Sequence, residues 1–261
     1  MRALSIASTG MLAQQLNVEV ISNNIANMNT TGYKRQRAEF QDLLYQNLIR
    51  VGAETSEQNT RSPSGIQIGV GVRAGGVYRI TTQGNLTQTG NRYDLAIDGR
   101  GYFRVELPNG GDAFSRAGSF QLSDQGELVT PEGYRVLPGI TIPEDAIDVA
   151  ITETGLVQVK LAGQVAFQNA GQVELATFAN EAGLESIGSN LLIESPSSGS
   201  PAFAIPGEPG YGIIRQSFLE TSNVNPVSEI TALITAQRAY EMNSRVIQTA
   251  DEMMNSVNQI R

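Results

Sequence analysis

The sequence predicts an α+β protein with a long helix at each end of the chain, an antiparallel all-β domain inserted between the helices, and an extended connecting region. Two observations support this fold class. Apolar residues recur with a helical period in residues 3–29 and 228–261. Between these segments the apolar residues alternate as they do in strands, and turn-forming dipeptides are frequent. We expect the two helices to form an antiparallel pair.

The expected domain boundaries follow these changes of pattern. They are residues 1–30 for the N-terminal helix, 31–75 for an extended linker or hairpin region, 76–205 for the β-rich domain, 206–227 for a return connection and 228–261 for the C-terminal helix.

In the N-terminal helix, apolar residues recur at every seventh position. This row consists of Leu4, Met11, Val18 and Ile25, with Ile21 in a second row beside it. The opposite face holds Ser, Thr, Gln and Asn, and its only charged side chains are Arg2 and Glu19. This face fits an ordinary surface helix. It fits equally a face that meets other subunits, because uncharged polar groups lose less on desolvation than charges do.

The extended region and the β domain are marked by their turn residues. Asn29, Thr30, Thr31 and Gly32 end the first helix, since glycine readily takes a left-handed conformation. Residues 51–64 consist mainly of Gly, Ser, Thr, Gln and Glu, which is typical of an extended or mobile loop. Runs such as 102–107 and 156–161 alternate in the manner of strands, and pairs such as Asp98-Gly99 and Asn109-Gly110 favour tight hairpins.

The C-terminal helix carries the longest apolar stripe of the chain. Its central row, again with a seven-residue period, consists of Leu233, Tyr240, Ile247 and Met254. Flanking rows widen this stripe to about 100°, the geometry of a helix that buries one face. The helix therefore needs a partner, and the first helix is one candidate within the chain.

Composition excludes several classes of function. The formal net charge of −8 disfavours nucleic-acid binding, which requires clustered positive charge. The chain has no Cys and no His, so nucleophile pairs and zinc sites built from these residues are excluded. We expect no catalytic residue, metal or cofactor. No apolar stretch approaches the roughly 18 residues of a membrane span, and the N-terminus does not resemble a secretory signal.

Two weaker patterns have simpler explanations. Gly69, Gly71 and Ala74 match a permissive dinucleotide-binding motif, but a strand-like segment follows where the motif requires a helix. Glu144, Asp145 and Asp148 gather three carboxylates, which could indicate a metal site or a glycosidase pair. Acidic residues next to Pro143 are more often a solvated turn.

One motif resembles a known family. It runs through Asn24, Ile25, Ala26, Asn27, Asn29, Thr30, Gly32, Tyr33 and Lys34. Residues 221–225 and 237–244 near the C-terminus, and 96–103 and 115–120 in the middle, suit the same family. With these motifs the chain resembles the bacterial flagellar rod and hook proteins over essentially its whole length.

Within that family the resemblance is to members of the distal rod. The chain length indicates this, as does a stretch that would brace neighbouring subunits and includes Gln41, Leu44, Tyr45, Gly65, Ile66, Gly69 and Gly71. Proximal rod or hook relatives are the nearest alternatives.

The resemblance implies a structural role without enzymatic activity. The terminal helices would form an inner helical coiled-coil tube domain, with the β domain outside it. The subunit would assemble helically with copies of itself into a hollow shaft that transmits torque. Its implied partners are proximal rod proteins, the hook protein, the L-ring and P-ring proteins and the flagellar export apparatus. It would lie in the basal body, spanning the periplasm without a cleavable signal peptide. No nucleic acid and no membrane insertion are expected.

Two alternatives come from other functional classes. A periplasmic enzyme acting on the cell wall through carboxylates would need two acidic side chains facing each other in a cleft. A β-rich binding module would bind sugars or proteins through its middle domain.

Overall fold

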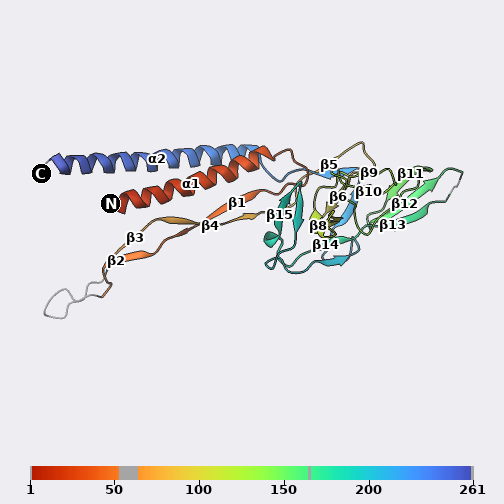
Figure 1. Ribbon diagram of the computed structural model, residues 1–261, viewed down its shortest axis with the longest axis horizontal. Coiled ribbons are helices and arrows are strands. Elements are labelled where there is room, and N and C mark those ends of the chain that lie inside the picture. The colour runs from red at the N-terminus through yellow and green to blue at the C-terminus, as the bar shows by residue number, and fades with distance from the viewer. Residues whose placement is uncertain (1, 53–63, 164–165, 260–261) are drawn as a thin grey trace. The chain divides into compact units, whose positions relative to one another are not determined.

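The computed structural model describes residues 2–52, 64–163 and 166–259. It divides into two compact units, each assembled from separate parts of the chain (Figure 1). Unit 1 comprises Met1–Ile25, Gln36–Tyr78 and Pro226–Arg261, and unit 2 comprises Ala26–Arg35 and Arg79–Asn225. Each unit is therefore held together by contacts between segments that lie far apart in the sequence.

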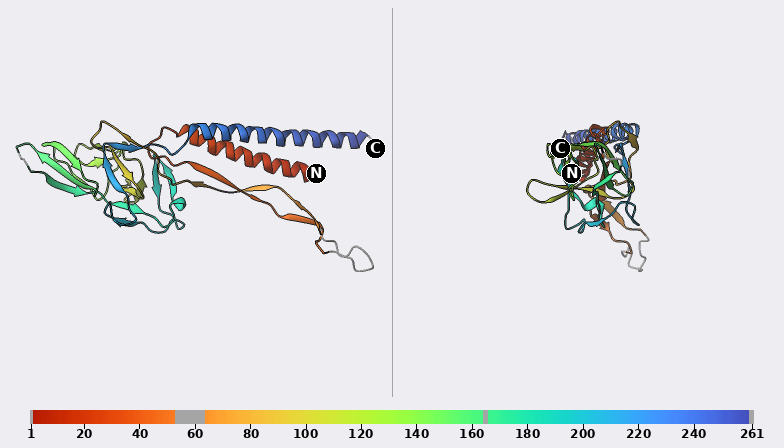
Figure 2. Two further views of the ribbon diagram at one scale, coloured as in Figure 1. Left: turned by 180° about the vertical axis from the view of Figure 1, so that it is seen from behind. Right: turned by 90° about the vertical axis from the view of Figure 1, so that its right-hand side faces the viewer.

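Unit 1 contains the two helices and two strand pairs. Its elements are α1 (Arg2–Ala26), β1 (Gln36–Asp42), β2 (Tyr45–Ile49), β3 (Ile66–Gly69), β4 (Val72–Arg79) and α2 (Pro226–Gln259). The helices lie side by side and run in opposite directions (Figures 1 and 2). Strand β1 pairs with β4, and β2 pairs with β3, so residues 36–49 and 66–79 form the two sides of a long hairpin.

The predicted fold class is wrong. The described residues contain only two α-helices, of 25 and 34 residues, and the large middle of the chain is rich in β-sheet. They do not form a helical coiled-coil tube domain around which a β domain is inserted. A coiled coil buries its apolar row against the partner helix, whereas Tyr240 of that row is 44% exposed and the apolar residues that α2 buries are Ala236 and Ala250. The seven-residue period predicts a helix, but it does not predict burial by this one partner.

Unit 2 consists mainly of short strands. They are β5 (Leu86–Gln88), β6 (Leu95–Asp98), β7 (Tyr102–Glu106), β8 (Asp112–Ser115), β9 (Gln121–Leu122), β10 (Leu128–Val129), β11 (Ala146–Ile151), β12 (Leu156–Leu161), β13 (Gln168–Gln172), β14 (Leu175–Thr177), β15 (Glu185–Gly188), β16 (Leu191–Ile193), β17 (Ala202–Ala204), β18 (Ile213–Gln216) and β19 (Phe218–Glu220), with a short 3₁₀ helix, η1 (Glu181–Gly183).

The largest sheet has six strands in the order β15-β16-β8-β7-β14-β17. A second sheet has the order β11-β12-β13, and the pairs β18-β6, β19-β5 and β10-β9 complete the described sheets. Strands β18 and β19 come late in the sequence, yet they pair antiparallel with the early strands β6 and β5. The last segment of unit 2 therefore closes the unit onto its first strands.

The six-stranded sheet has a packed core on each face. Alternate residues of a strand point to opposite faces. Accordingly Phe103 of β7 lies in the larger cluster with Leu175 of β14, whereas Tyr102 lies in the smaller cluster with Ala176. The rings of Phe103 and Phe120 are 5.1 Å apart at an interplanar angle of 85°, an edge-to-face contact that aromatic pairs favour. Burial on both faces explains why this sheet is rich in apolar residues.

The turn chemistry of the β-rich region agrees with the sequence. Gly99, Gly110, Gly126 and Gly133 all have positive φ, between 74° and 115°. Residues with a side chain rarely adopt this conformation, so Asp98-Gly99 and Asn109-Gly110 mark their turns correctly. Local chemistry decides these turns, which is why the sequence predicts them.

Candidate functional site

The helices carry most of the residues predicted to pack against other subunits. Ile21 is buried, and the other members on α1, namely Leu4, Met11, Val18 and Ile25, are partly buried. On α2, Leu233, Ile247 and Met254 are partly buried, and Tyr240 is 44% exposed. The fold of one chain therefore leaves much of this apolar row accessible.

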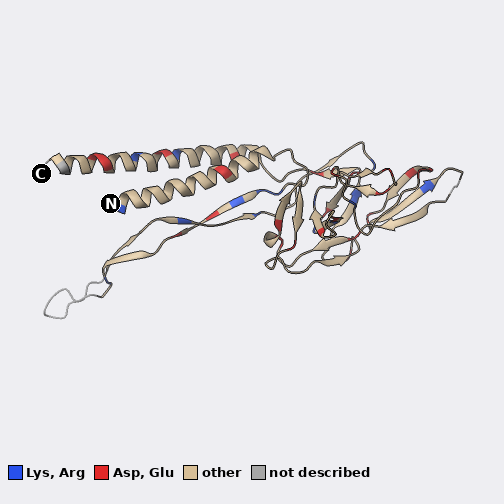
Figure 3. Cartoon of the chain, in the orientation of Figure 1, with Lys and Arg blue, Asp and Glu red and all other residues tan. Residues whose placement is uncertain are grey.

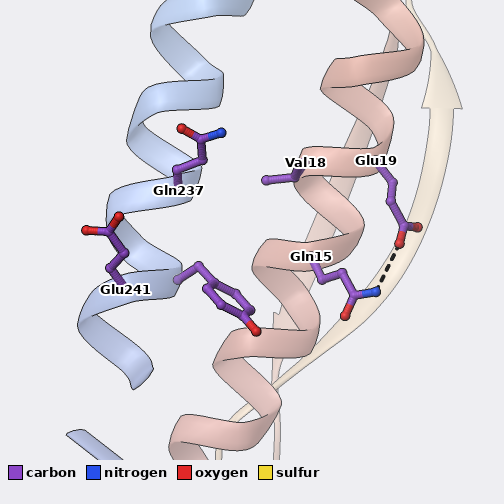
Figure 4. Close-up of a pocket in the computed structure, with 6 residues that line it drawn as sticks. Gln15, Val18, Glu19, Gln237 and Glu241 are labelled. Carbon is purple, nitrogen blue, oxygen red and sulfur yellow. Dashed lines mark hydrogen bonds between the residues drawn. The ribbon is translucent and has the colours of Figure 1, made fainter. Parts of the chain in front are cut away.

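A shallow groove runs between the two helices. It is lined by Gln15, Val18 and Glu19 of α1 and by Gln237, Tyr240 and Glu241 of α2. Figure 4 shows Val18 on the side of α1 that faces α2, with Gln15 donating a hydrogen bond to Glu19 at 3.2 Å. The structure thus brings Val18 and Tyr240, one from each predicted row, to the same groove.

A second apolar surface of α2 lies outside the predicted central row, and only Val246 and Met253 of it belong to a predicted flanking row. Six of its large apolar side chains are 45–73% exposed, and these are Val227, Ile230, Ile234, Met242, Val246 and Met253. Figure 3 shows charged residues widely spaced along both helices. The helical period marks α2 as amphipathic, but a wide apolar stripe does not reveal which part of it the first helix leaves uncovered.

The predicted bracing stretch forms part of the hairpin of unit 1. Leu44 is 86% exposed, Tyr45 56% and Ile66 48%. Gln41 is exposed and its side-chain oxygen accepts a hydrogen bond from Arg73 at 3.0 Å.

Two of the three glycines of that stretch, Gly65 and Gly71, lie too close to a neighbour for a side chain, whereas Gly69 has ordinary space. A Cβ on Gly65 would lie 2.7 Å from the backbone nitrogen of Val51, and one on Gly69 would lie 3.4 Å from the Tyr45 ring. A Cβ on Gly71 would overlap the Thr9 hydroxyl. Gly65 thus allows the two sides of the hairpin to approach one another, and Gly71 allows the hairpin to approach α1.

Asn24 of the family-like motif joins three elements of unit 1. Its side-chain nitrogen donates to the backbone oxygen of Gln36 at 2.8 Å and to Glu229 Oε2 at 3.1 Å, and its Oδ1 accepts from the Gln36 backbone nitrogen at 2.9 Å. Asn24 and Glu229 are both almost fully buried. One amide side chain therefore links the end of α1, the start of β1 and the first turn of α2.

The next residues of the motif form a turn in unit 2. The Thr30 hydroxyl hydrogen-bonds Asn27 Oδ1 at 3.0 Å, and the Thr30 backbone nitrogen donates to the Asn27 oxygen at 3.1 Å. Ile25 and Tyr33 are partly buried, whereas Ala26 and Asn29 are exposed. The motif thus forms the turn that follows α1, and through Asn24 it also links α1 to β1 and α2.

Lys34 belongs to a buried ion cluster. Glu220, 1% exposed at its side chain, accepts from Lys34 Nζ at 2.6 Å and from Arg116 Nε at 2.5 Å. The Gly84 backbone nitrogen donates to the same carboxylate at 2.8 Å, and Arg116 also donates to backbone oxygens of residues 97, 99 and 101. A buried carboxylate is tolerated when its charge and lone pairs are satisfied in this way.

The cluster shifts the titration of its members. Burial by itself raises the pKa of Glu220, but Arg116 and Lys34 together outweigh burial and hold that pKa below its ordinary value. Burial lowers the pKa of Lys34, and the attraction of Glu220 offsets part of this effect. Glu220 is therefore the anion on which the cluster depends. Lys34 and Arg116 both lie in family-like stretches of the sequence, but Glu220 does not, and no local pattern pairs it with residues so far away.

The carboxylates considered for catalysis do not form a cleft. Glu144 and Asp145 are exposed, and Asp148 Oδ1 lies 3.5 Å from Arg92 Nη1 at the surface. Within residues 2–52, 64–163 and 166–259, no group of three His, Cys, Asp or Glu side chains could hold a metal ion. The dinucleotide-like motif spans β3 and β4, with no helix after it. Among the described helices, none is long and apolar enough to cross a membrane.

Comparison with known proteins identifies the family. Three family models match: "Flagella basal body rod protein" at residues 4–34, "Flagellar hook protein FlgE/F/G D1 domain" at 96–159 and "Flagellar basal body rod FlgEFG protein C-terminal" at 215–260. The chain is 59% identical to the flagellar basal-body rod protein FlgG of Caulobacter vibrioides, with all of both chains covered. This chain belongs to the flagellar basal-body rod protein family.

Other members of the rod protein family refine this result. FlgG of Agrobacterium fabrum is 54% identical, with 98% of both chains covered. FlgF of Caulobacter vibrioides is only 33% identical, with 97% of this chain and 95% of FlgF covered. The similarity is thus greater to FlgG, the distal rod protein, than to FlgF of the same bacterium. The predicted resemblance to distal members of the family is confirmed.

Proposed function

We propose that this chain is a structural subunit of the flagellar distal rod, which assembles with copies of itself into a hollow shaft that carries torque. The observation that carries the proposal is the similarity to FlgG over the full length of both chains. The exposed apolar side chains of α2 and of the hairpin support it. Monomeric proteins rarely leave such surfaces uncovered, so contact with further subunits accounts for them.

The remaining partners belong to the same proposal. We place the subunit in the flagellar basal body, between proximal rod proteins and the hook protein and inside the L-ring and P-ring proteins. We further propose that the flagellar export apparatus delivers it. The surfaces that would make these contacts are the predicted packing residues on α1 and α2 and the bracing stretch of the hairpin. The role is structural and requires no enzymatic activity or cofactor.

Electron microscopy of the purified full-length protein at high concentration tests self-assembly. We expect straight hollow rods. Persistent monomers at every concentration and ionic strength would contradict the proposal.

The alternative function, an enzyme that acts on the cell wall, is tested on the same preparation. Release of peptidoglycan fragments that is lost in Glu144→Gln or Asp148→Asn would favour an enzyme instead.

A further inference from the structure

Three segments of unit 1 meet at Gly71. The Thr9 hydroxyl of α1 accepts a hydrogen bond from the Val72 backbone nitrogen at 3.3 Å and donates one to the Ile6 backbone oxygen at 2.8 Å. From the other side, the Leu43 backbone nitrogen donates to the Gly71 oxygen at 2.9 Å. Hydrogen bonds therefore link helix α1 to both sides of the hairpin at the position of Gly71.

The approach of Thr9 depends on glycine at position 71. Gly71 has φ 128°, a conformation that side chains rarely adopt. A Cβ at this position would overlap the Thr9 hydroxyl and lie 3.2 Å from the Thr9 Cβ. Any other residue would push the hairpin away from α1 and break the hydrogen bond to Val72.

Beyond Leu43 and Gly71, the described part of the hairpin has no buried apolar side chain that would fix its position. We call residues 43–52 and 64–70 the arm. Its strands pair with each other, with Tyr45 opposite Gly69 and Gln46 opposite Ile68. No apolar side chain in the described part of the arm is buried, and Leu44, Leu48 and Val51 are 54–86% exposed. Side-chain packing does not fix the direction of the arm, so its base must.

We propose that Thr9 and Gly71 form a latch that fixes the direction of the arm relative to α1, so that the apolar side chains of the arm meet a second copy of this chain at one defined place. The second copy is the occupant because the chain belongs to a family of rod proteins and Arg50 is the one charged residue in the described part of the arm. That part rests on the proposed function, whereas the latch itself does not.

The absence of native cysteine allows the latch to be tested in the full-length chain. Spin labels at Ser5→Cys on α1 and Gln67→Cys on β3, both exposed positions, report the distance between the helix and the arm. We expect a single narrow distance distribution in the otherwise unchanged chain. Gly71→Ala and Thr9→Val should each convert it into a broad one. Thr9→Ser, which keeps the hydroxyl, should keep the narrow distribution of the unchanged chain.

Gly52→Ala is the matched control for Gly71→Ala. Gly52 also lies in the arm at positive φ, 79°, but a Cβ there would meet nothing within 4 Å. This variant should keep the narrow distribution. A broad distribution in the unchanged chain would overturn the proposal, and so would a narrow one in both Gly71→Ala and Thr9→Val.

Hydrogen exchange at the Val72 amide gives a second readout, which remains usable if Gly71→Ala fails to fold. Protection should be lost in Thr9→Val and kept in Thr9→Ser; an amide already unprotected in the unchanged chain would refute the latch. Assembly separates the two proposals. Rods that form normally with an unlatched arm would contradict the contact between the arm and a second copy, whereas a well-defined arm in a chain that never assembles would contradict the proposed function alone.

Discussion

At the scale of single residues, Gly32 is held in a conformation and a space that only glycine fits. It has φ 67°, and a Cβ would lie 2.7 Å from the Ala117 backbone nitrogen. Its own backbone nitrogen donates to the backbone carbonyl oxygen of Glu220 at 2.8 Å. The turn that ends the motif therefore packs directly on the backbone beside the ion cluster.

We expect Gly32→Ala to destabilise unit 2 by about 2–4 kcal/mol, roughly 1 kcal/mol from the positive φ and the rest from overpacking. Gly133→Ala is the control, because Gly133 has φ 87° and open space around it. That variant should lose only about 1 kcal/mol. Denaturant unfolding of both variants measures the difference, and equal losses would show that the contact with Ala117 has no cost.

Glu220 makes unit 2 sensitive to acid. Because its pKa is lower in the folded state than in the unfolded state, its contribution is complete above the unfolded value and is lost as pH falls through the folded value. We expect Glu220→Gln to lose about 3–5 kcal/mol at pH 7, since two buried cations lose their anion. The loss should shrink steadily below about pH 4.5.

Unfolding free energies of the Glu220→Gln variant and the unchanged chain, measured between pH 7 and pH 3, check this prediction. Glu185→Gln, at an exposed strand position, is the matched control and should change stability by less than about 0.5 kcal/mol. A constant difference between Glu220→Gln and the unchanged chain across the acid range would mean that the carboxylate does not titrate as the cluster requires.

At the scale of elements, α2 presents an apolar surface that its own chain does not cover. Ile234 is 45% exposed. We expect Ile234→Asp to raise the concentration needed for assembly on the order of tenfold or more, because a charge would be desolvated in the contact. The helix content of the free subunit should remain unchanged.

Gln248→Asp is the control for α2, because it places the same charge at an exposed polar position of the same helix. It should assemble nearly as the unchanged chain does. Sedimentation over a range of protein concentrations measures both variants. Equal effects at the two positions would show that added charge, rather than the apolar surface, governs assembly.

The arm provides an independent prediction. Leu44 and Leu48 are 86% and 54% exposed, so Leu44→Ser with Leu48→Ser should change the stability of the free subunit by no more than about 1 kcal/mol. Assembly should weaken on the order of tenfold if these side chains become buried in the rod. Gln46→Ser with Gln67→Ser, on the same strand pair, should assemble normally. Unchanged assembly in the leucine variant would remove the arm from the subunit contact.

At the scale of the whole molecule, the net charge is carried almost entirely by unit 2. Unit 2 has ten Lys and Arg against seventeen Asp and Glu, a net charge of −7, and unit 1 has eight against nine, a net charge of −1. In the proposed assembly, each added copy brings a further net charge of −7 in its unit 2. Repulsion between these charges opposes assembly and is screened by salt.

We therefore expect the concentration needed for assembly to fall as ionic strength rises from about 0.01 M to 0.15 M, a range in which the screening length drops from about 30 Å to about 8 Å. Light scattering at a series of salt concentrations measures this dependence. Ile234→Asp should show the same trend from a higher starting concentration. Assembly that weakens with added salt would indicate that attractive ion pairs between copies dominate.

The sequence predicted local features better than burial. The positive φ of the glycine turns and the helical period of both terminal segments depend on residues close in sequence. The exposure of Ile234 or Leu44 depends on which surfaces meet, and so does the failure of the predicted coiled-coil tube. The role of Lys34 shows the same limit, because its motif was visible in the sequence while its partner, Glu220, lies 186 residues away.

By itself, the sequence determined the family, the absence of Cys and His chemistry, and the positions of helices, turns and motif residues. These depend on residue identity and on short-range periodicity, which the chain order carries directly. Only the tertiary structure decided that Asn24 links α1, β1 and α2, that Glu220 joins Lys34 to Arg116, and that Thr9 meets Gly71. Such contacts bring distant segments together, and their energies depend on burial and geometry that no local pattern contains.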